Sequence, residues 1–302
     1  MLANSILETL GNTPLVKLQH LKKDSADVYV KLESRNPSFS VKDRAVKYII
    51  SDLMASGQLK KGDTIIEETS GNTGIGLSAA GAALGLNVVI VMPETMSNER
   101  KQLMKAYGAE LVLTPGSEGM KGAADKAAAL VEERHAILFG QFTNEANVNA
   151  HYETTGPEIM KDLPDVDAFV AGVGTGGTVT GVSKYLKEQN DRIVTYAVEP
   201  ADSPLLSEGK AGSHKIQGIG ANFIPAVFDK QYIDHFLKVT NEEAITTMQK
   251  LAAEQGILAG ISSGANVSAA LHVAEELGAG KKVVTVLPDS GERYLSAGVF
   301  GD

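Results

Sequence analysis

A glycine-rich segment near the middle of the chain has the residue types of an anion site. Residues 172–178 read Gly-Val-Gly-Thr-Gly-Gly-Thr, after an apolar stretch and before a helical pattern. Glycines let backbone N–H groups approach an anion closely, and the start of a helix adds a favourable partial charge. Thr175 and Thr178 add hydroxyl donors, so the segment predicts a phosphate site. A tight structural turn is the alternative that this one motif leaves open.

A second segment, residues 69–74, reads Thr-Ser-Gly-Asn-Thr-Gly and also precedes a helical pattern. It gathers hydroxyl, amide and backbone donors at one helix start, which is the donor set that a substrate carboxylate needs. An ordinary N-capped turn would use the same residues. Two such segments in one chain favour anion binding at both.

Two further motifs suggest other enzyme classes. Gly172, Gly174 and Gly177 have the dinucleotide-binding spacing, and Glu199 follows where an acid for the ribose is expected, so an NAD-dependent dehydrogenase is one alternative. Residues 260–264 fit the GxSxG pattern of serine hydrolases. Only His272 follows that serine, with no acid between them, so the triad order fails. The six histidines show no metal-binding spacing, and no metal is expected.

Composition limits the classes further. The 302 residues suggest two domains, and the formal charge of -9 has the wrong sign for nucleic acid or a polybasic membrane anchor. There is no cysteine, so no thiolate or disulfide chemistry is available. No targeting segment and no apolar run of about 20 residues is present, which favours a cytoplasmic protein with small-molecule partners.

The elements that position these motifs can be predicted from periodicity. Short apolar runs alternate with helical patterns, which indicates an α/β protein with parallel sheets covered by helices on both faces. Thr240 and Glu243 predict a capped helix, and the polar interval 142–152 suggests a domain boundary nearby. The predicted strands are 28–32, 64–67, 88–92, 110–113, 168–171, 193–198, 235–239 and 283–287. The predicted helices include 45–56, 74–84, 98–107, 121–133 and 179–187.

Eight segments, in order along the chain, together resemble one family. They are LGNTPL (10–15), NPSFSVKDR (36–44), TSGNTG (69–74), PETMS (93–97), GVGTGGT (172–178), KIQGIGA (215–221), GILAGISSGA (256–265) and SGERYLS (290–296). The chain is similar to the cysteine synthase (O-acetylserine sulfhydrylase) family of fold type II pyridoxal-phosphate enzymes. The likeness runs from about residue 4 to the end. Position 222 is Asn where the family usually has Gly, and position 68 is Glu where Pro is common.

The resemblance implies a tryptophan synthase β-like fold with two domains, each built on a mainly parallel sheet covered by helices. Residues 37–146 would form a smaller, mobile domain with the substrate-carboxylate loop. Residues 1–36 and 147–302 would form a larger domain with the loop for the phosphate of pyridoxal 5'-phosphate. The family also implies a homodimer, and a possible partner in the C-terminal tail of serine acetyltransferase.

The resemblance also assigns roles to residues. Lys42 would be catalytic and would carry the cofactor as a Schiff base, because a desolvated amine is both nucleophile and base. Ser262 would face the pyridine nitrogen, and Asn72 the ring hydroxyl. The cofactor phosphate would be held by Gly174, Thr175, Gly176, Gly177 and Thr178. The substrate carboxylate would be bound by Thr69, Ser70, Asn72, Thr73 and Gln141.

The implied reaction is a transfer at the β-carbon of an amino acid. O-acetyl-L-serine and sulfide would give L-cysteine and acetate through α-aminoacrylate. A cystathionine β-synthase-like enzyme, a cysteine desulfhydrase and a lanthionine-forming enzyme are alternatives on the same scaffold, since the sequence leaves both substrates open. The alternatives from other classes are the dehydrogenase named above and a non-catalytic binding scaffold.

Overall fold

A computed structural model describes residues 2–19 and 21–300, so His20 lies outside the described residues. The chain divides into two compact units, residues 1–10 with 42–147 and residues 11–41 with 148–302. These bounds differ from the expected 37–146 at the N-terminal side. The 3-10 helix η1 (Ile6–Thr9) packs on α2 (Asn72–Leu84), which places the first residues with the smaller unit. The N–H of Val41 donates to the carbonyl of Pro288, which keeps the preceding residues with the larger unit.

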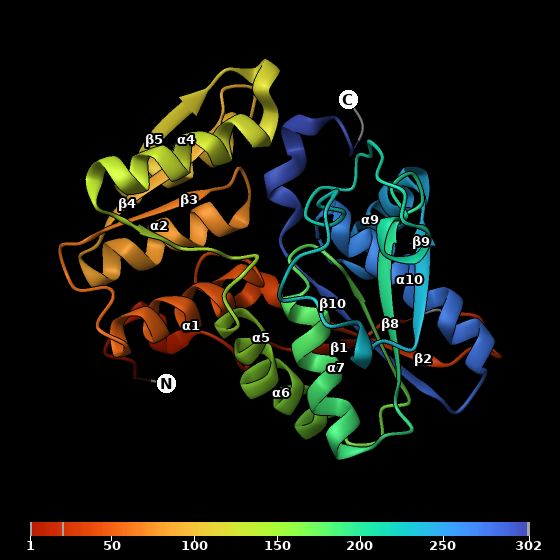
Figure 1. Ribbon diagram of the computed structural model, residues 1–302. Coiled ribbons are helices and arrows are strands. Elements are labelled where there is room, and N and C mark those ends of the chain that lie inside the picture. Colours follow the sequence, from red (N-terminus) through yellow and green to blue (C-terminus); the bar gives the residue numbers. More distant parts are fainter. Residues whose placement is uncertain (1, 20, 301–302) are drawn as a thin grey trace. The chain divides into compact units, whose positions relative to one another are not determined.

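The smaller unit contains a four-stranded, fully parallel sheet in the order β5-β4-β3-β6. Its strands are β3 (Thr64–Glu68), β4 (Asn87–Pro93), β5 (Glu110–Thr114) and β6 (Ile137–Leu138). Its other helices are α1 (Lys42–Ala55), α3 (Asn98–Ala106) and α4 (Gly119–Arg134). Because successive strand residues face opposite sides, Ile65 packs with α1 and α2 while Ile66 packs with α4. Helices therefore cover both faces of this sheet, as Figure 1 shows.

The larger unit contains a six-stranded sheet in the order β1-β2-β10-β7-β8-β9. All its pairings are parallel except that of β1 with β2. The strands are β1 (Leu15–Lys17), β2 (Asp27–Leu32), β7 (Ala168–Gly172), β8 (Val194–Pro200), β9 (His235–Val239) and β10 (Lys282–Leu287). The predicted strands and the α/β class are thus confirmed in both units. The two strands that periodicity missed, β1 and β6, are three and two residues long.

Helices also cover both faces of the larger sheet (Figure 1). Val170 packs with residues of α9 (Asn241–Gln255) and α10 (Ile261–Leu277). Phe169, its neighbour along β7, packs instead with α6 (Gly156–Asp162) and α7 (Gly177–Gln189). The short α8 (Leu205–Glu208) follows β8. Thr240 and Glu243 form the predicted capping box of α9.

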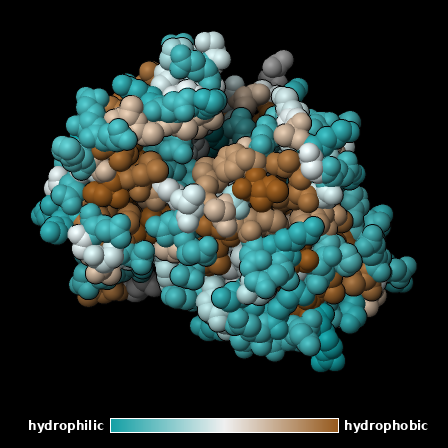
Figure 2. Space-filling view, in the orientation of Figure 1, coloured by the Kyte–Doolittle hydropathy of each residue, from teal (hydrophilic) through white to brown (hydrophobic). Residues whose placement is uncertain are grey.

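The polar interval 142–152 is largely helical. It contains α5 (Ala146–Ala150) and the start of a π-helical turn, η4 (His151–Thr155), and the division between the units falls between residues 147 and 148. Within the described ranges, no helix is both long enough and apolar enough to cross a membrane. The surface in Figure 2 is mainly hydrophilic with separate apolar areas.

Candidate active site

The predicted carboxylate loop lies between the end of β3 and the start of α2. The N–H of Thr69 donates to the carbonyl of Val91 on the neighbouring strand at 3.1 Å, which fixes the loop to the sheet. The hydroxyl of Thr69 then accepts the N–H of Gly71 at 3.2 Å. Asn72 and Thr73 are the first residues of α2. The loop therefore places hydroxyl and amide groups at the N-terminus of a 13-residue helix, where an anion is favoured.

Gln141 joins this loop from a distant part of the sequence. It follows β6, which pairs with β3 in parallel, so both segments leave the sheet at the same edge. The hydroxyl of Thr73 donates to Oε1 of Gln141 at 2.6 Å, and the Asn147 side chain donates to the Gln141 carbonyl at 2.9 Å. Thr73 and Gln141 are both buried. The structure thus brings together two residues predicted to bind the same carboxylate.

Arg100 and Glu67 were not identified from the sequence, although both are close to the carboxylate loop. The Arg100 guanidinium, on α3, donates to the backbone carbonyl of Ser70 at 3.4 Å. Glu67 precedes the loop on β3 and is fully buried. Burial raises the pKa of the Glu67 carboxyl group to about 8, and the charge of Glu68 adds to the rise. The N–H groups of Gly140 and Gln141 and the Gln141 amide oppose it.

Lys42 is the first residue of α1 and is half-buried. The helix behind it is anchored by Val46, Ile49 and Ile50, which belong to the apolar core of the smaller unit. This packing gives the lysine a fixed backbone from which a long side chain can extend. Lys42 and the carboxylate loop therefore belong to one unit, whereas the predicted phosphate loop and Ser262 belong to the other.

The predicted phosphate loop connects β7 to α7, and two of its glycines are required by space or backbone conformation. A Cβ atom on Gly174 would lie 2.3 Å from the carbonyl oxygen of Gly218. Gly176 has a φ of +89°, and a Cβ atom there would lie 2.7 Å from Cβ of Phe228. Neither position accepts a side chain without a backbone shift. The loop therefore has no side chain at these two positions and leads into the start of a 13-residue helix, as a phosphate cradle requires.

The two threonines of this loop are held by local hydrogen bonds. Oγ1 of Thr175 accepts the N–H of Gly177 at 3.4 Å. Oγ1 of Thr178 lies 3.2 Å from Nε2 of His151, whose Nδ1 lies 2.9 Å from Oγ1 of Thr155. His151 is buried in the π-helical turn η4, an element often found at functional sites. The sequence did not place His151 beside this loop, because a single histidine in a polar interval gives no periodic signal.

Ser262 is the second residue of α10 and is buried. A Cβ atom on Gly218 would lie 3.5 Å from its hydroxyl, and Gly218 in turn lies against Gly174. Ser262 is therefore next to the phosphate loop. The sequence after Ser262 has no carboxylate and histidine in the order of a catalytic triad. Helix α10 contributes a second residue to this region, Asn266, whose Oδ1 accepts the N–H of Gly172 at 2.8 Å.

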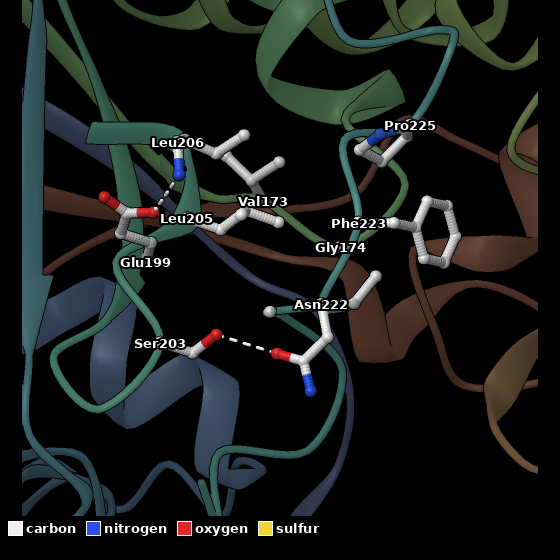
Figure 3. Close-up of a pocket in the computed structure, with 11 residues that line it drawn as sticks. Val173, Gly174, Glu199, Ser203, Leu205, Leu206, Asn222, Phe223 and Pro225 are labelled. Carbon is white, nitrogen blue, oxygen red and sulfur yellow. Dashed lines mark hydrogen bonds between the residues drawn. The ribbon is translucent and has the colours of Figure 1, made fainter. Parts of the chain in front are cut away.

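Glu199 contradicts the dehydrogenase interpretation. Its two carboxylate oxygens accept the N–H groups of Leu206 at 2.7 Å and Ser207 at 3.0 Å. Figure 3 shows the bond from Leu206. The side chain is buried, and both oxygens are used by the start of α8. A carboxylate held in this way is a structural cap of the chain, so it does not serve as the acid for a ribose.

Asn222 lines a small hollow of the larger unit, beside Val173 and Gly174 (Figure 3). Its φ is +62°, a left-handed conformation that Asn tolerates better than most residues. The Ser203 hydroxyl donates to Oδ1 of Asn222 at 2.7 Å and accepts the N–H of Gly212 at 3.1 Å. The glycine usual in the family at this position could not make the first of these bonds.

These features fit pyridoxal phosphate as a cofactor. The chain has a candidate phosphate loop in which positions 174 and 176 accept only glycine, and a buried serine hydroxyl lies beside that loop. It also has a half-buried lysine at the start of a helix. No cluster of three or more potential metal ligands occurs in residues 2–19 and 21–300.

Comparison with known proteins identifies the family. The family model described as "Pyridoxal-phosphate dependent enzyme" matches residues 6–289. A cysteine synthase of Staphylococcus aureus is 53% identical over 300 residues, covering 98% of this chain and 97% of the relative. Cysteine synthase A of Escherichia coli is 51% identical over 306 residues, covering 97% and 94%. The structure of a hydrogen sulfide-producing enzyme from Fusobacterium nucleatum is similar with a TM-score of 0.93 and 47% identity, covering 97% of this chain and 100% of that one. The chain therefore belongs to the family of pyridoxal-phosphate-dependent enzymes.

Proposed function

We propose that the chain is a cysteine synthase that converts O-acetyl-L-serine and sulfide into L-cysteine and acetate. The observation that carries this proposal is the match over nearly the full length to two proteins named cysteine synthase, at 53% and 51% identity. In the reaction the bond between the β-carbon and the acetate oxygen breaks, and a bond between the β-carbon and sulfur forms. No oxidant or reductant is needed.

The phosphate loop and Ser262 supply the binding site for the cofactor. Backbone N–H groups of residues 174–178 and the hydroxyls of Thr175 and Thr178 would hold the phosphate. Ser262 would bind the pyridine nitrogen, and Asn72 the ring hydroxyl. When bound, pyridoxal phosphate supplies an electron sink for the α-carbon, which no side chain can provide.

Lys42 carries the cofactor and moves the proton. Its amine would hold the cofactor through the aldehyde. With the amino-acid substrate bound, Nζ would take the proton from the substrate α-carbon. Because Lys42 is the first residue of α1, its backbone is fixed by the helix core behind it. The same Nζ returns a proton to the α-carbon when sulfide has been added.

The carboxylate loop orients the amino-acid substrate. Thr69, Ser70, Asn72, Thr73 and Gln141 provide the donors. The start of α2 adds a favourable partial charge for the carboxylate. Donors fixed before the substrate arrives reduce the entropy lost on binding. This part of the site does not distinguish O-acetylserine from serine or cysteine, which share the same carboxylate.

Other β-replacement reactions on the same scaffold are tested directly with substrate pairs. Purified protein loaded with pyridoxal phosphate is given O-acetylserine with sulfide, serine with homocysteine, or cysteine alone, and cysteine, cystathionine and released sulfide are measured. The proposal predicts the largest kcat/KM for O-acetylserine with sulfide. A larger value for serine with homocysteine, or for sulfide release from cysteine, would replace it with the corresponding alternative.

The proposal extends to assembly and location. A homodimer is supported by exposed large apolar side chains, including Phe223 and Ile224, and by apolar areas on the face in Figure 2. Light scattering on the purified protein measures the mass of the assembly, which should be twice 31.8 kDa.

A cytoplasmic location is also proposed. The C-terminal tail of serine acetyltransferase is proposed as a competitor of the amino-acid substrate. A peptide of that tail should raise the KM for O-acetylserine and leave kcat unchanged.

A further inference from the structure

Glu67 is a buried acid on β3 that the proposed mechanism does not use. Its side chain is fully buried, and the N–H of Gly140 donates to Oε2 at 2.9 Å. The sheet explains this contact. Ile66 pairs with Leu138, and the N–H of Phe139 donates to the Ile66 carbonyl at 2.9 Å. The chain that leaves β6 therefore passes Glu67 immediately before it reaches Gln141.

Gln141 is held on several sides. Its side-chain Oε1 accepts the Thr73 hydroxyl at 2.6 Å, and its backbone carbonyl accepts the Asn147 amide at 2.9 Å. The residue before it, Gly140, donates its N–H to Oε2 of Glu67 at 2.9 Å, which holds the backbone that leads into Gln141. The side-chain amide NH₂ of Gln141 carries two hydrogens, which are donors for a carboxylate. With Oε1 turned to Thr73, the orientation of that NH₂ group is fixed.

We infer that Glu67 is a positioning residue, which holds the backbone at Gly140 and so places the Gln141 side chain to donate from its amide to the carboxylate of the amino-acid substrate. This inference rests on the proposed function, because it assigns Glu67 to the substrate-carboxylate part of that site. Glu67 acts through Gln141 and does not itself contact the substrate. Its contribution therefore depends on the presence of the Gln141 side chain.

The cost of burying this acid supports a role beyond filling space. A carboxyl group that is buried loses its hydration, and this loss costs free energy. An apolar residue of similar volume would not carry that cost. No hydrogen bond of good geometry reaches Oε1 of Glu67 from any described residue. Burial raises the pKa of the Glu67 carboxyl group to about 8, so it is mainly neutral at pH 7. A neutral carboxyl group beside the carboxylate loop avoids repulsion of an anionic substrate.

The test compares variants of the holoenzyme by a binding titration. Glu67→Ala and Glu67→Met remove the polar contacts, and Met keeps most of the volume. Glu67→Gln keeps both the shape of the neutral acid and an acceptor for Gly140. O-acetylserine is titrated against the visible band of the bound cofactor. We expect the half-maximal concentration to rise by at least about tenfold for Ala and Met, as when a buried polar group loses its partner. For Gln it should stay within about threefold.

A double-mutant cycle separates positioning from general support of the fold. If Glu67 acts through Gln141, Glu67→Met should add no more than about twofold to the effect of Gln141→Ala, because coupled residues are not additive. If the double variant instead shows the product of the two single-variant changes in half-maximal concentration, the inference is overturned. Loss of the cofactor band in both Glu67→Ala and Glu67→Met would also overturn it, since Glu67 would then support the whole unit. Glu132→Gln, at an exposed position of α4, serves as the control and should bind substrate like the wild type.

The wild-type titration keeps this inference separate from the proposed function. If O-acetylserine leaves the wild-type spectrum unchanged, the proposed function fails, and with it the basis of the inference. If the wild type responds and the Ala and Met variants respond at the same concentration, only the role of Glu67 is refuted.

Discussion

The hydroxyl of Thr73 donates a 2.6 Å hydrogen bond to Oε1 of Gln141, and both side chains are buried. These residues are 68 positions apart, yet the parallel pairing of β3 with β6 brings them to one edge of the sheet. The bond fixes the Gln141 amide before any substrate is bound. One half of the candidate site is therefore organised within the smaller unit alone.

Thr73→Val tests this bond because it removes the hydroxyl and keeps the branched shape. It leaves the buried Oε1 of Gln141 with one partner fewer, at a cost of about 1–3 kcal/mol in stability. The melting temperature should fall, and the KM for O-acetylserine should rise more than kcat falls. Thr246→Val, at an exposed position of α9, is the control and should change neither quantity. An unchanged KM in Thr73→Val would remove Thr73 from the substrate site.

Lys42→Ala should abolish the reaction, because it removes both the attachment point of the cofactor and the base. Loss of a positioned acid or base alone costs about 10²- to 10⁴-fold in rate. The visible band of lysine-bound cofactor should disappear as well. Lys47→Ala changes a half-buried lysine on the same helix and should retain both the band and the turnover. Retained turnover in Lys42→Ala would refute the assignment of this lysine.

Gly174→Ala should weaken cofactor binding. Its Cβ atom would lie 2.3 Å from the Gly218 carbonyl oxygen, so the backbone of the phosphate loop must move. Overpacking of this kind costs about 1–3 kcal/mol, which is roughly a five- to 150-fold loss of affinity if it falls on the bound state. Affinity is measured by titrating pyridoxal phosphate into the stripped enzyme. Gly209→Ala is the control, since a Cβ atom there meets nothing within 4 Å and only its φ of +71° is unfavourable. Equal affinity of Gly174→Ala and wild type would show that this loop does not hold the phosphate.

The stability of the protein should depend on the protonation of Glu67. The pKa of its carboxyl group is raised to about 8 in the folded state from an ordinary value of 4.5. The stabilisation from proton uptake is therefore fully present below pH 4.5 and is lost as the pH rises through about 8, at about 1.4 kcal/mol per pH unit. Glu67→Gln does not titrate, so its melting temperature minus that of the wild type should increase from pH 5 to pH 8. Glu132→Gln, at an exposed position, should show a constant difference. A constant difference for Glu67→Gln would contradict the raised pKa.

Much of the fold could be predicted from the sequence because its strands are buried. Strands such as 64–67 and 168–171 are covered on both faces, so they appear as apolar runs with clear limits. The short edge strands β1 and β6 were not predictable in this way. β6 has two residues, and its pairing with β3 depends on contacts across about 70 positions of sequence. Helix α10 was not predicted because its apolar residues surround the whole helix and give no stripe.

The candidate site was predictable where glycine and hydroxyl residues follow a strand. Residues 69–74 and 172–178 have that pattern, and the structure places each between a strand and a helix. Glu67, Arg100 and His151 have no such pattern. Their contacts to the two loops arise from tertiary packing, which a single sequence does not reveal. Glu199 shows the opposite case. Its spacing from the glycines suggested an acid for a ribose, but its carboxylate caps the start of α8.

The absorbance spectrum of the purified holoenzyme, recorded before and after adding O-acetylserine and then sulfide, tests the central claim most directly. The visible band of lysine-bound cofactor should shift when O-acetylserine is added. It should return when sulfide follows, with one cysteine formed per cofactor. A colourless protein, or a band that O-acetylserine leaves unchanged, would contradict the assignment of this chain as a cysteine synthase.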